Sequence, residues 1–581
     1  MSVKLAKTAG FCMGVKRAVD MVLEMASKKG HETIYTYGPL IHNPQTIELL
    51  RQRGIVPITT PEELDKVPSG SLIVIRAHGI PPQEKTNIEE KGFKVVDATC
   101  PRVTRVQSII RKHALAGFTV LIVGDPEHPE VNGLLGFAGD KGIIVGSSKD
   151  IDQLLPYKKV CVVAQTTQSL SFYNSLVKKV KERFPAAVIF DTICDSTEKR
   201  QAEIETLAAE SDAVFVVGGK NSANTRRLAE IAQTKGTPTF HIETADELKE
   251  ISLEPYRHIG VSAGASTPNW IINRVVDHLN ARTGKREEFF YRFFKIWVFA
   301  VRNDIYSAIG AGCLTFTAML MQGLPIKPGP VLTASFYVYA MHVLNRFINR
   351  KTSSISSFRE ESYLLHEKLY LTLAAFSIVG ALGVSLTMGL APFLVLFSIS
   401  LLGALYNMRL LPSGSRFRSL RDIPGSKNIS TAFAWAVAAA FLPRLQNGLA
   451  FDCGFFVSFF FTAGIVFIRS AMSDILEIQR DRLIGQETLP VLIGEEKTLT
   501  ILKAVTGGLL FMLLFSSVTG GSTSLASFEL ICIFYIWICF KLYDRRAAFS
   551  GVVFEGFLES SYIVAGISSL VWLEARMIFI R

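Results

Sequence analysis

The sequence predicts a soluble α/β module followed by an all-α module that crosses a membrane several times. In residues 1–285, short Val- and Ile-rich runs alternate with charged, helix-like stretches, as in soluble α/β proteins. From about residue 300 onward, apolar runs of roughly twenty residues carry few charges, and this length spans a bilayer. The mean hydropathy of +0.30 is therefore shared unevenly between the two halves.

Four continuous apolar runs in the first half predict buried parallel strands, since both faces of such strands are covered by helices. The runs are "SLIVIRAHG" (71–79), "FTVLIVGDPEH" (118–128), "KVCVVAQTTQS" (159–169) and "DAVFVVGGKNSANT" (212–225). Each ends in polar residues, and ligands bind beyond the carboxyl ends of parallel strands. The polar ends therefore predict one site. No GxGxxG or GxxxxGK[ST] string follows any run, which argues against a dinucleotide or P-loop enzyme.

The loop "GDPEHPEVNG" (124–133) concentrates titratable side chains at the end of one such strand. Pro126 and Pro129 break the helix that a HExxH zinc site requires. From the residues alone, the loop is a metal site, a proton-transfer site or a solvated turn. We expect Asp125 and Glu127 to be ordinary loop carboxylates.

Three cysteines divide the first half into comparable thirds. Cys12, Cys100 and Cys194 each precede a helix-like segment, whereas Cys161 lies inside a strand-like run and fits a buried structural role. The sequence "MSVKLAKTAG" lacks the apolar core of a signal peptide, so we expect this half to stay in the cytoplasm. Metal binding or catalysis is then favoured over disulfides, although three structural cysteines remain an alternative.

The net charge of +11 does not indicate nucleic-acid binding. Residues 1–285 hold 36 Lys and Arg against 32 Asp and Glu, and the remaining excess lies in a few loops of the second half. This distribution is typical of the positive-inside rule. The basic segment 280–295 joins the halves and is expected at the membrane surface.

Residues 1 to about 280 resemble the LytB/IspH family of 4-hydroxy-3-methylbut-2-enyl diphosphate reductases. The resemblance rests on the strings "AGFCMGVKRAV", "GPLIHNP", "RAHG", "DATCP", "EHPEVNG", "QTT", "KNSANTRRL" and "SAGAS". It implies three α/β lobes in pseudo-threefold arrangement, with one cysteine from each holding a [4Fe–4S] cluster. With Cys12, Cys100 and Cys194 as the three thiolates, one iron keeps an open position. Ala223 departs from the serine of many relatives.

The resemblance also implies roles for the polar strand ends. Glu130 would be the general acid/base, and Thr166 would hold the substrate hydroxyl and pass protons along. The products would be isopentenyl and dimethylallyl diphosphate, with electrons from a carrier such as flavodoxin or ferredoxin. The residues implied in binding the diphosphate are His42, His78, His128, Ser222, Asn224 and Ser266, with Thr197 facing the same cavity.

The second half is expected to form about nine transmembrane helices. Apolar runs lie near 303–323, 329–348, 369–389, 391–409, 429–446, 455–473, 499–519, 526–543 and 549–573. With the first half in the cytoplasm, alternate loops that carry most Lys and Arg fall inside. The expected organisation is a reductase domain (1–281), a basic linker (282–300) and a multi-pass domain (301–581) in a bacterial inner membrane.

The string "SDILEIQRDRLIGQETLPVLIG" (473–494) resembles the second acidic motif of the UbiA superfamily of membrane prenyltransferases. The implied groups for Mg²⁺ and diphosphate are Asp474, Glu477, Asp481, Arg409 and Lys427. The family's first motif, NDxxDxxxD, is replaced by "LNRFINRKTS" (344–353), in which Asn345 and Asn349 offer only amide oxygens. The second half is thus either a prenyltransferase or an inactive anchor or prenyl-lipid binder. A further alternative makes the first half a redox sensor that regulates the second.

Overall fold

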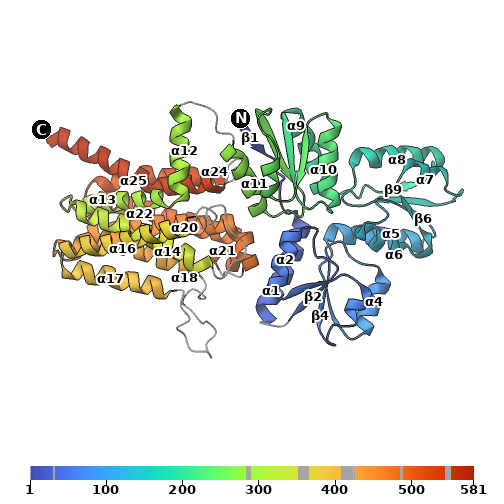
Figure 1. Ribbon diagram of the computed structural model, residues 1–581, viewed down its shortest axis with the longest axis horizontal. Helices are drawn as coiled ribbons and strands as arrows, with labels where there is room; N and C mark the ends of the chain where they lie inside the picture. The colour runs from blue at the N-terminus through green and yellow to red at the C-terminus, as the bar shows by residue number, and fades with distance from the viewer. Residues whose placement is uncertain are drawn as a thin grey trace. The chain divides into compact units, whose positions relative to one another are not determined.

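The protein is described by a computed structural model that covers residues 2–29, 33–282, 289–350, 366–406, 420, 423, 425–484, 488–543 and 551–580. The chain divides into two compact units, Met1–Gly284 and Lys285–Arg581 (Figure 1). The first contains strands and helices, and the second is helical throughout its described residues. Each unit is considered by itself.

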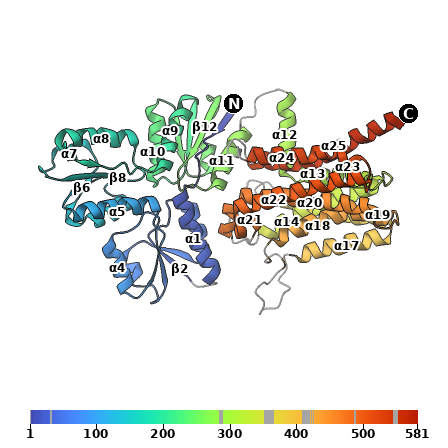
Figure 2. The ribbon, with the colours of Figure 1, turned by 180° about the vertical axis from the view of Figure 1, so that it is seen from behind.

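Unit 1 holds three separate four-stranded parallel sheets, which opposite views show as three helix-flanked lobes (Figures 1 and 2). One sheet has the order β1-β12-β10-β11, another β3-β2-β4-β5, and the last β7-β6-β8-β9. The strands are β1 Ser2–Leu5, β2 Ile34–Tyr37, β3 Ile55–Ile58, β4 Leu72–Ile75, β5 Lys94–Asp97, β6 Thr119–Val123, β7 Gly142–Val145, β8 Val160–Ala164, β9 Val188–Ile189, β10 Ala213–Val217, β11 Thr239–Ile242 and β12 His258–Ala263.

The four predicted strands are confirmed as β4, β6, β8 and β10, and each occupies an interior position of its sheet. Their side chains are buried almost throughout, because helices cover both faces. The covering helices are α1 Met13–Lys29, α2 Pro44–Gln52, α3 Pro61–Leu64, α4 Pro82–Glu90, α5 Pro101–Leu115, α6 Pro129–Ala138, α7 Ser148–Asp152, α8 Leu170–Arg183, α9 Asp195–Ala209, α10 Ala223–Thr234 and α11 Asn269–Arg282, with short 3₁₀ turns at Gly139–Lys141 and Ala245–Glu250.

The described helices of unit 2 pack around one large apolar core, and a smaller cluster of Val343, Tyr370 and Ala374 lies between α14 and α16. They are α12 Phe289–Arg302, α13 Ile305–Met321, α14 Pro328–Arg350, α16 Glu367–Met388, α17 Leu390–Leu405, α18 Ser426–Ala436, α19 Leu442–Gln446, α20 Cys453–Ile484, α21 Leu489–Ile493, α22 Glu495–Thr519, α23 Leu525–Phe528, α24 Leu530–Tyr543 and α25 Gly551–Ile580; a π-helical turn, Val437–Phe441, joins α18 to α19.

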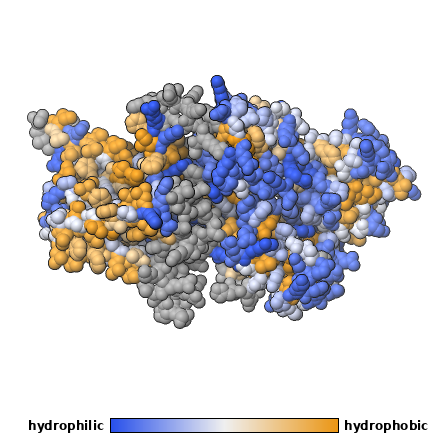
Figure 3. Space-filling model, in the orientation of Figure 1, coloured by the Kyte–Doolittle hydropathy of each residue, from blue (hydrophilic) through white to orange (hydrophobic). Residues whose placement is uncertain are grey.

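On the face shown in Figure 3, the surface of unit 2 is strongly apolar, whereas that of unit 1 is mostly hydrophilic. Large apolar side chains of unit 2 are widely exposed, among them Phe376 (73%) and Phe511 (70%), as expected for helices that face lipid. Within the described residues, five helices are long and apolar enough to cross a membrane, or six if the bent pair α12–α13 is one span. Each of the nine expected spans overlaps a helix, and the count of nine stays a prediction.

Helix α12 begins inside the segment that the sequence analysis assigns to a linker, and it packs against α13 and α25 of unit 2. It meets α13 at an angle of 84°. Asp304 forms the bend, with φ of +58°, the single positive φ among the described non-glycine residues. Phe293 and Phe299 on α12 are exposed, as expected for a helix lying along a membrane surface.

Candidate functional site

A single cleft in unit 1 brings together all twelve residues that the sequence analysis singles out there. It encloses about 750 Å³ between protein atoms, open solvent at its mouth included. The three groups lie on its wall: the cysteines Cys12, Cys100 and Cys194; the pair Glu130 and Thr166; and the polar set His42, His78, His128, Thr197, Ser222, Asn224 and Ser266. Residues up to about 250 positions apart therefore share one cavity.

Each cysteine stands at the start of a helix. Cys100 and Cys194 are the N-cap residues of α5 and α9, and Cys12 directly precedes α1. The positive ends of three helix dipoles thus face the sulfurs and favour thiolates. Without a bound group, burial raises the pKa of the Cys100 thiol. Gly14 permits the approach of α1, because a Cβ there would lie 2.5 Å from the Cys100 Sγ and 4.0 Å from the Cys12 Sγ.

The spacing of these thiols bears on what they could hold. A single zinc-like ion bonds sulfur at about 2.3 Å, so its ligand sulfurs lie within about 4.6 Å of one another. Among the described residues, the group whose ligand atoms lie mutually within 4.8 Å is His42, His78 and His128, and the three cysteines do not form such a group. They still line one cavity. The positions of the three thiols therefore do not match a site for a single ion.

The three histidines form a compact cluster, with ring centroids 4.7 to 5.9 Å apart. The pKa of His42 and that of His128 are lowered to about 4, mainly because the rings are buried. Burial also lowers the pKa of His78 well below its usual range. All three imidazoles are therefore neutral at neutral pH. The Nδ1 atom of His128 accepts a hydrogen bond from the Glu130 main-chain N–H (3.1 Å), so its proton resides on Nε2.

Several buried polar atoms of this wall have no hydrogen-bond partner among the residues that the structure describes. They are the His42 Nε2, the His78 Nδ1 and the Asn224 Nδ2. Ser222 and Asn224 lie at the N-terminus of α10, where main-chain N–H groups favour an anion. Ser266 donates to the His42 carbonyl oxygen (3.2 Å), which links the two loops that carry these residues. Neutral donors around an open cavity suit a phosphate-bearing ligand.

Glu130 is fully buried at the start of α6, and Thr166 follows strand β8. The Thr166 main-chain N–H donates to Oε1 (2.6 Å), and its hydroxyl donates to Oε2 (2.9 Å). Burial raises the pKa of Glu130, and these two hydrogen bonds oppose the rise. A carboxyl group with a raised pKa, on the cavity wall beside a hydroxyl, is suited to exchange protons with a bound ligand.

The expectation that Asp125 is an ordinary loop carboxylate is wrong. Both of its oxygens accept from the buried Arg227 Nη2 at 2.8 Å, and Arg227 Nη1 donates to the Thr167 carbonyl oxygen (2.7 Å). This ion pair joins the lobe of β10 to the lobe of β6 and β8. The sequence analysis missed it because the two residues lie 102 positions apart. Glu127 is exposed, as an ordinary loop residue would be.

In unit 2, the acidic side chains of α20 meet the start of α18. Lys427 Nζ donates to Asp474 Oδ1 (2.6 Å), and Asn428 Nδ2 donates to its Oδ2 (2.9 Å). Glu477 pairs with Arg480 on the same helix (3.3 Å), and Asp481 accepts from the Thr488 hydroxyl (3.2 Å). The structure thus places Lys427 on the acidic motif. Arg409 lies outside the described residues.

The α14 segment that replaces the first acidic motif contains an ion pair instead of a carboxylate set. Arg346 donates through Nε and Nη2 to Asp304 at 2.6 and 2.7 Å, and His342 Nδ1 lies 3.5 Å from the same carboxylate. Asn345 is half-buried on α14, and the side chain of Asn349 lies outside the described residues. Sequence reasoning missed Asp304 because it lies 42 positions before Arg346.

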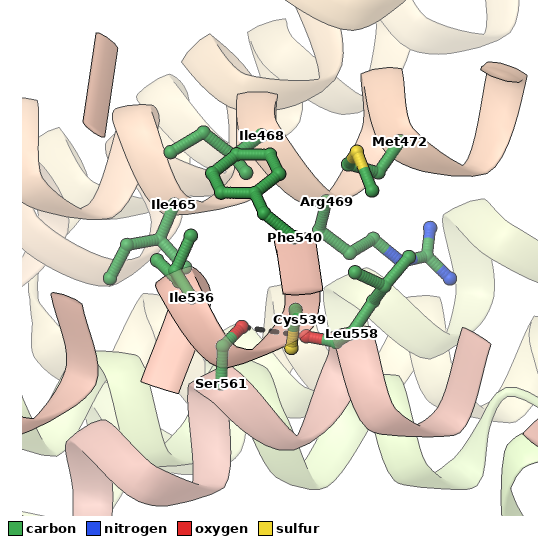
Figure 4. Close-up of a pocket in the computed structure, with 9 residues that line it drawn as sticks. All are labelled: Ile465, Ile468, Arg469, Met472, Ile536, Cys539, Phe540, Leu558 and Ser561. Atoms are coloured by element: carbon green, nitrogen blue, oxygen red, sulfur yellow. Dashed lines mark hydrogen bonds between the residues drawn. The ribbon is translucent and has the colours of Figure 1, made fainter. Parts of the chain in front are cut away.

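A second buried ion pair joins α20 to α25, where Arg469 donates to Glu559. Arg469 also borders a small pocket between α20, α24 and α25, about 260 Å³ between protein atoms with open solvent included (Figure 4). Its other walls are mainly apolar, and Ser561 donates to the Leu558 carbonyl oxygen (2.7 Å). Charged groups inside a membrane bundle are expensive and usually mark a functional region.

The family match found by comparison with known proteins ends close to the boundary between the two units. A family model described as "LytB protein" matches residues 3–280. A 4-hydroxy-3-methylbut-2-enyl diphosphate reductase of Caldanaerobacter subterraneus subsp. tengcongensis is 38% identical over 287 residues, covering 49% of this chain and 99% of the relative.

Two solved structures extend the comparison to both units. The E-1-hydroxy-2-methyl-but-2-enyl-4-diphosphate reductase from Plasmodium falciparum has a TM-score of 0.46 at 29% identity, covering 49% of this chain and 88% of that one. A UbiA homolog from Archaeoglobus fulgidus, bound to GPP and Mg²⁺, has a TM-score of 0.35 at 15% identity, covering 47% and 99%.

Proposed function

Because this chain belongs to the LytB family, we infer that its first unit reduces 4-hydroxy-3-methylbut-2-enyl diphosphate to isopentenyl and dimethylallyl diphosphate. The reaction breaks the allylic C–O bond. Two electrons and two protons enter, the hydroxyl oxygen leaves as water, and the allyl carbon gains a hydrogen. The observation that carries the assignment is the convergence of three cysteines, one buried acid and a set of neutral anion-binding donors on one cleft.

The three cysteines are proposed to hold a [4Fe–4S] cluster. Their donor chemistry, the three helix N-termini and the spacing beyond single-ion range support this fit. When bound, the cluster would supply electrons and, at an iron without a protein ligand, Lewis acidity. The electrons would come from a one-electron carrier such as flavodoxin or ferredoxin.

Glu130 and Thr166 are proposed to manage the protons. Burial raises the pKa of Glu130 and so favours its protonated form, and the Thr166 hydroxyl in contact with it faces the same cavity. Thr166 would hold the substrate hydroxyl and relay a proton from Glu130 to the departing oxygen. The depth of the acid also keeps bulk water away from the reacting carbon.

The diphosphate is proposed to bind the opposite wall through neutral donors. The unpartnered nitrogens of His42, His78 and Asn224, the His128 Nε2–H and the α10 N-terminus supply hydrogen bonds without a Walker motif. Ser222 and Ser266 add hydroxyls, and Thr197 borders the cavity near Cys194. Ala223 lines the cavity where a hydroxyl would add one contact.

For the second unit, we propose binding or transfer of a prenyl diphosphate at the cytoplasmic side of a nine-span bundle in a bacterial inner membrane. The acids Asp474, Glu477 and Asp481 would gather Mg²⁺, and Lys427 would contact the diphosphate. This proposal rests on the acidic motif and its cluster with Lys427. An inactive anchor that keeps the reductase near a prenyl-lipid membrane is the second candidate, favoured by the Arg346–Asp304 ion pair at the first motif.

The reductase proposal is tested on the full chain in detergent, under anaerobic conditions, with a one-electron donor and the five-carbon substrate. Both isomeric products should form, and Glu130→Gln should lower turnover by about 10² to 10⁴-fold while leaving the cluster absorption unchanged. Glu127→Gln, three residues away and exposed, is the matched control and should retain activity. A loaded protein without turnover would favour the redox-sensor alternative.

A further inference from the structure

Arg200 places a buried positive charge on the helix that begins after Cys194 and against the loop that leads into Cys12. It lies on α9, six residues after Cys194, and its side chain is 4% exposed. Its guanidinium donates to the carbonyl oxygens of Thr8, Gly10 (2.7 Å) and Ala263 (3.3 Å). The first two belong to the loop that leads into Cys12. One buried guanidinium therefore connects the elements that carry two of the three thiols.

The charge of Arg200 has no carboxylate partner within ion-pair distance among the described residues, since its hydrogen bonds all go to main-chain carbonyls. The nearest acid, Glu203, directs its oxygens to the Lys7 and Thr8 main-chain N–H groups (2.6 and 2.8 Å). A buried guanidinium without a counter-charge is costly. A neighbouring negative group is therefore expected to compensate it.

Arg200 interacts electrostatically with three groups that can carry negative charge, Cys12, Glu203 and Cys194. Two of these three are thiols of the proposed cluster site, and both are neutral in their protonated form. Compensation of Arg200 thus depends largely on whether anionic sulfur is present in the cleft. Carbonyl dipoles hold the guanidinium in place, and the thiolates supply the charge that completes the arrangement.

We propose that Arg200 is a positioning residue that fixes the Cys12 loop and raises the reduction potential of the metal group held by the three cysteines. This inference rests on the proposed function. A fixed positive charge in a low-dielectric interior stabilises the more negative, reduced state over the oxidised state. Arg200 acts through the cysteines and does not face the substrate, because it is absent from the wall of the cleft.

The two parts of this role make different predictions for substitutions. Arg200→Gln removes the charge and should lower the midpoint potential. Arg200→Lys keeps the charge, so its midpoint potential should lie close to that of the unchanged protein. Glu203→Gln removes a negative charge from the same neighbourhood and should raise the potential. A purely structural role for Arg200 predicts loss of metal in the variants but no shift of opposite sign between Arg200→Gln and Glu203→Gln.

The experiment is a redox titration of the anaerobically purified full chain, followed by electron paramagnetic resonance, after iron, sulfide and turnover of the unchanged protein have been measured. The expected shift for Arg200→Gln is about tenfold in the reduction equilibrium, or about 59 mV for one electron. Arg183→Gln is the matched control, because this exposed arginine also caps carbonyls, those of Asp152 and Leu154, but lies on α8.

The outcomes separate this inference from the proposed function. An unchanged protein without iron would overturn the proposed function and this inference with it. If the unchanged protein holds iron and is active, but Arg200→Gln has the same midpoint potential as Arg183→Gln, the role of Arg200 alone is overturned. If Arg200→Gln does not retain metal, an upward shift in Glu203→Gln supports the electrostatic account, and an unchanged potential in that variant contradicts it.

Discussion

Thr166 donates to both carboxylate oxygens of Glu130, through its main-chain N–H at 2.6 Å and its hydroxyl at 2.9 Å. Only the second contact depends on the side chain. Thr166→Val should therefore leave Glu130 buried but remove the hydroxyl that links it to the cavity. We expect turnover to fall by about 10²-fold with little change in stability, measured as kcat in the reductase assay and as melting temperature.

Thr166→Ser provides the control for this prediction, since it restores a hydroxyl at the same atom and should recover most of the activity. Equal losses in the two variants would show that the threonine methyl group matters for packing, and that the hydroxyl does not relay protons.

Diphosphate binding should be coupled to proton uptake by the histidine cluster. Burial lowers the pKa of His42 and His128 to about 4, so the free protein holds neutral imidazoles above that pH. A bound anion favours the charged form and raises these values toward 6.5. Between about pH 4 and 6.5, binding should therefore take up protons, and affinity should rise as the pH falls.

Calorimetry with inorganic pyrophosphate at pH 6, in buffers of different ionisation enthalpy, measures this uptake. His128→Asn should reduce the number of protons taken up, whereas His258→Asn, at an exposed position, should not. Equal buffer dependence in the unchanged protein and in His128→Asn would contradict the prediction, because the ligand's own ionisation would then explain all of it.

The Arg469–Glu559 pair should hold α20 to α25. Glu559 is fully buried, so Arg469→Met leaves its charge without a partner and should destabilise the unit by about 3 to 5 kcal/mol. The double variant Arg469→Met with Glu559→Leu removes both charges and should recover part of the loss. Thermal unfolding of the full chain in detergent measures both effects, and additive losses would contradict a coupled pair.

If unit 2 is a transferase, Asp474 should be essential to it. Mg²⁺-dependent consumption of a prenyl diphosphate should fall by at least about 10- to 100-fold in Asp474→Ala, because the carboxylate contacts both Lys427 and Asn428. Asp452→Asn is the control, since Asp452 stands at the opposite end of α20. Absence of consumption in the unchanged protein would favour the anchor.

For unit 1, the sequence predicted those features of the fold that depend on residues close together in the chain. The Val/Ile runs marked interior strands because parallel strands are apolar on both faces, and polar residues marked their carboxyl ends. The resemblance of the motifs brought Cys12, Cys100 and Glu130 into one predicted site. Their mutual geometry could not be predicted, because three separate sheets bring distant segments to the cleft.

The residues that sequence reasoning missed act through long-range partners. Asp125 is typical of a loop until Arg227, 102 positions later, engages both its oxygens. Asp304 sits at a strained bend, and its partner Arg346 comes from α14. Arg200 follows Cys194 in an unremarkable helical stretch, and only the folded chain brings the Cys12 loop to it. Pairwise contacts of this kind leave no local pattern.

The most direct test of the central claim measures iron, acid-labile sulfide and product formation in one anaerobic preparation of the full chain. The account predicts about four irons per chain and both five-carbon diphosphates. It also predicts loss of iron in Cys12→Ser, Cys100→Ser and Cys194→Ser but not in Cys161→Ser, since Cys161 is buried inside β8. Iron retained in Cys12→Ser, Cys100→Ser and Cys194→Ser, or turnover without iron, would contradict the account.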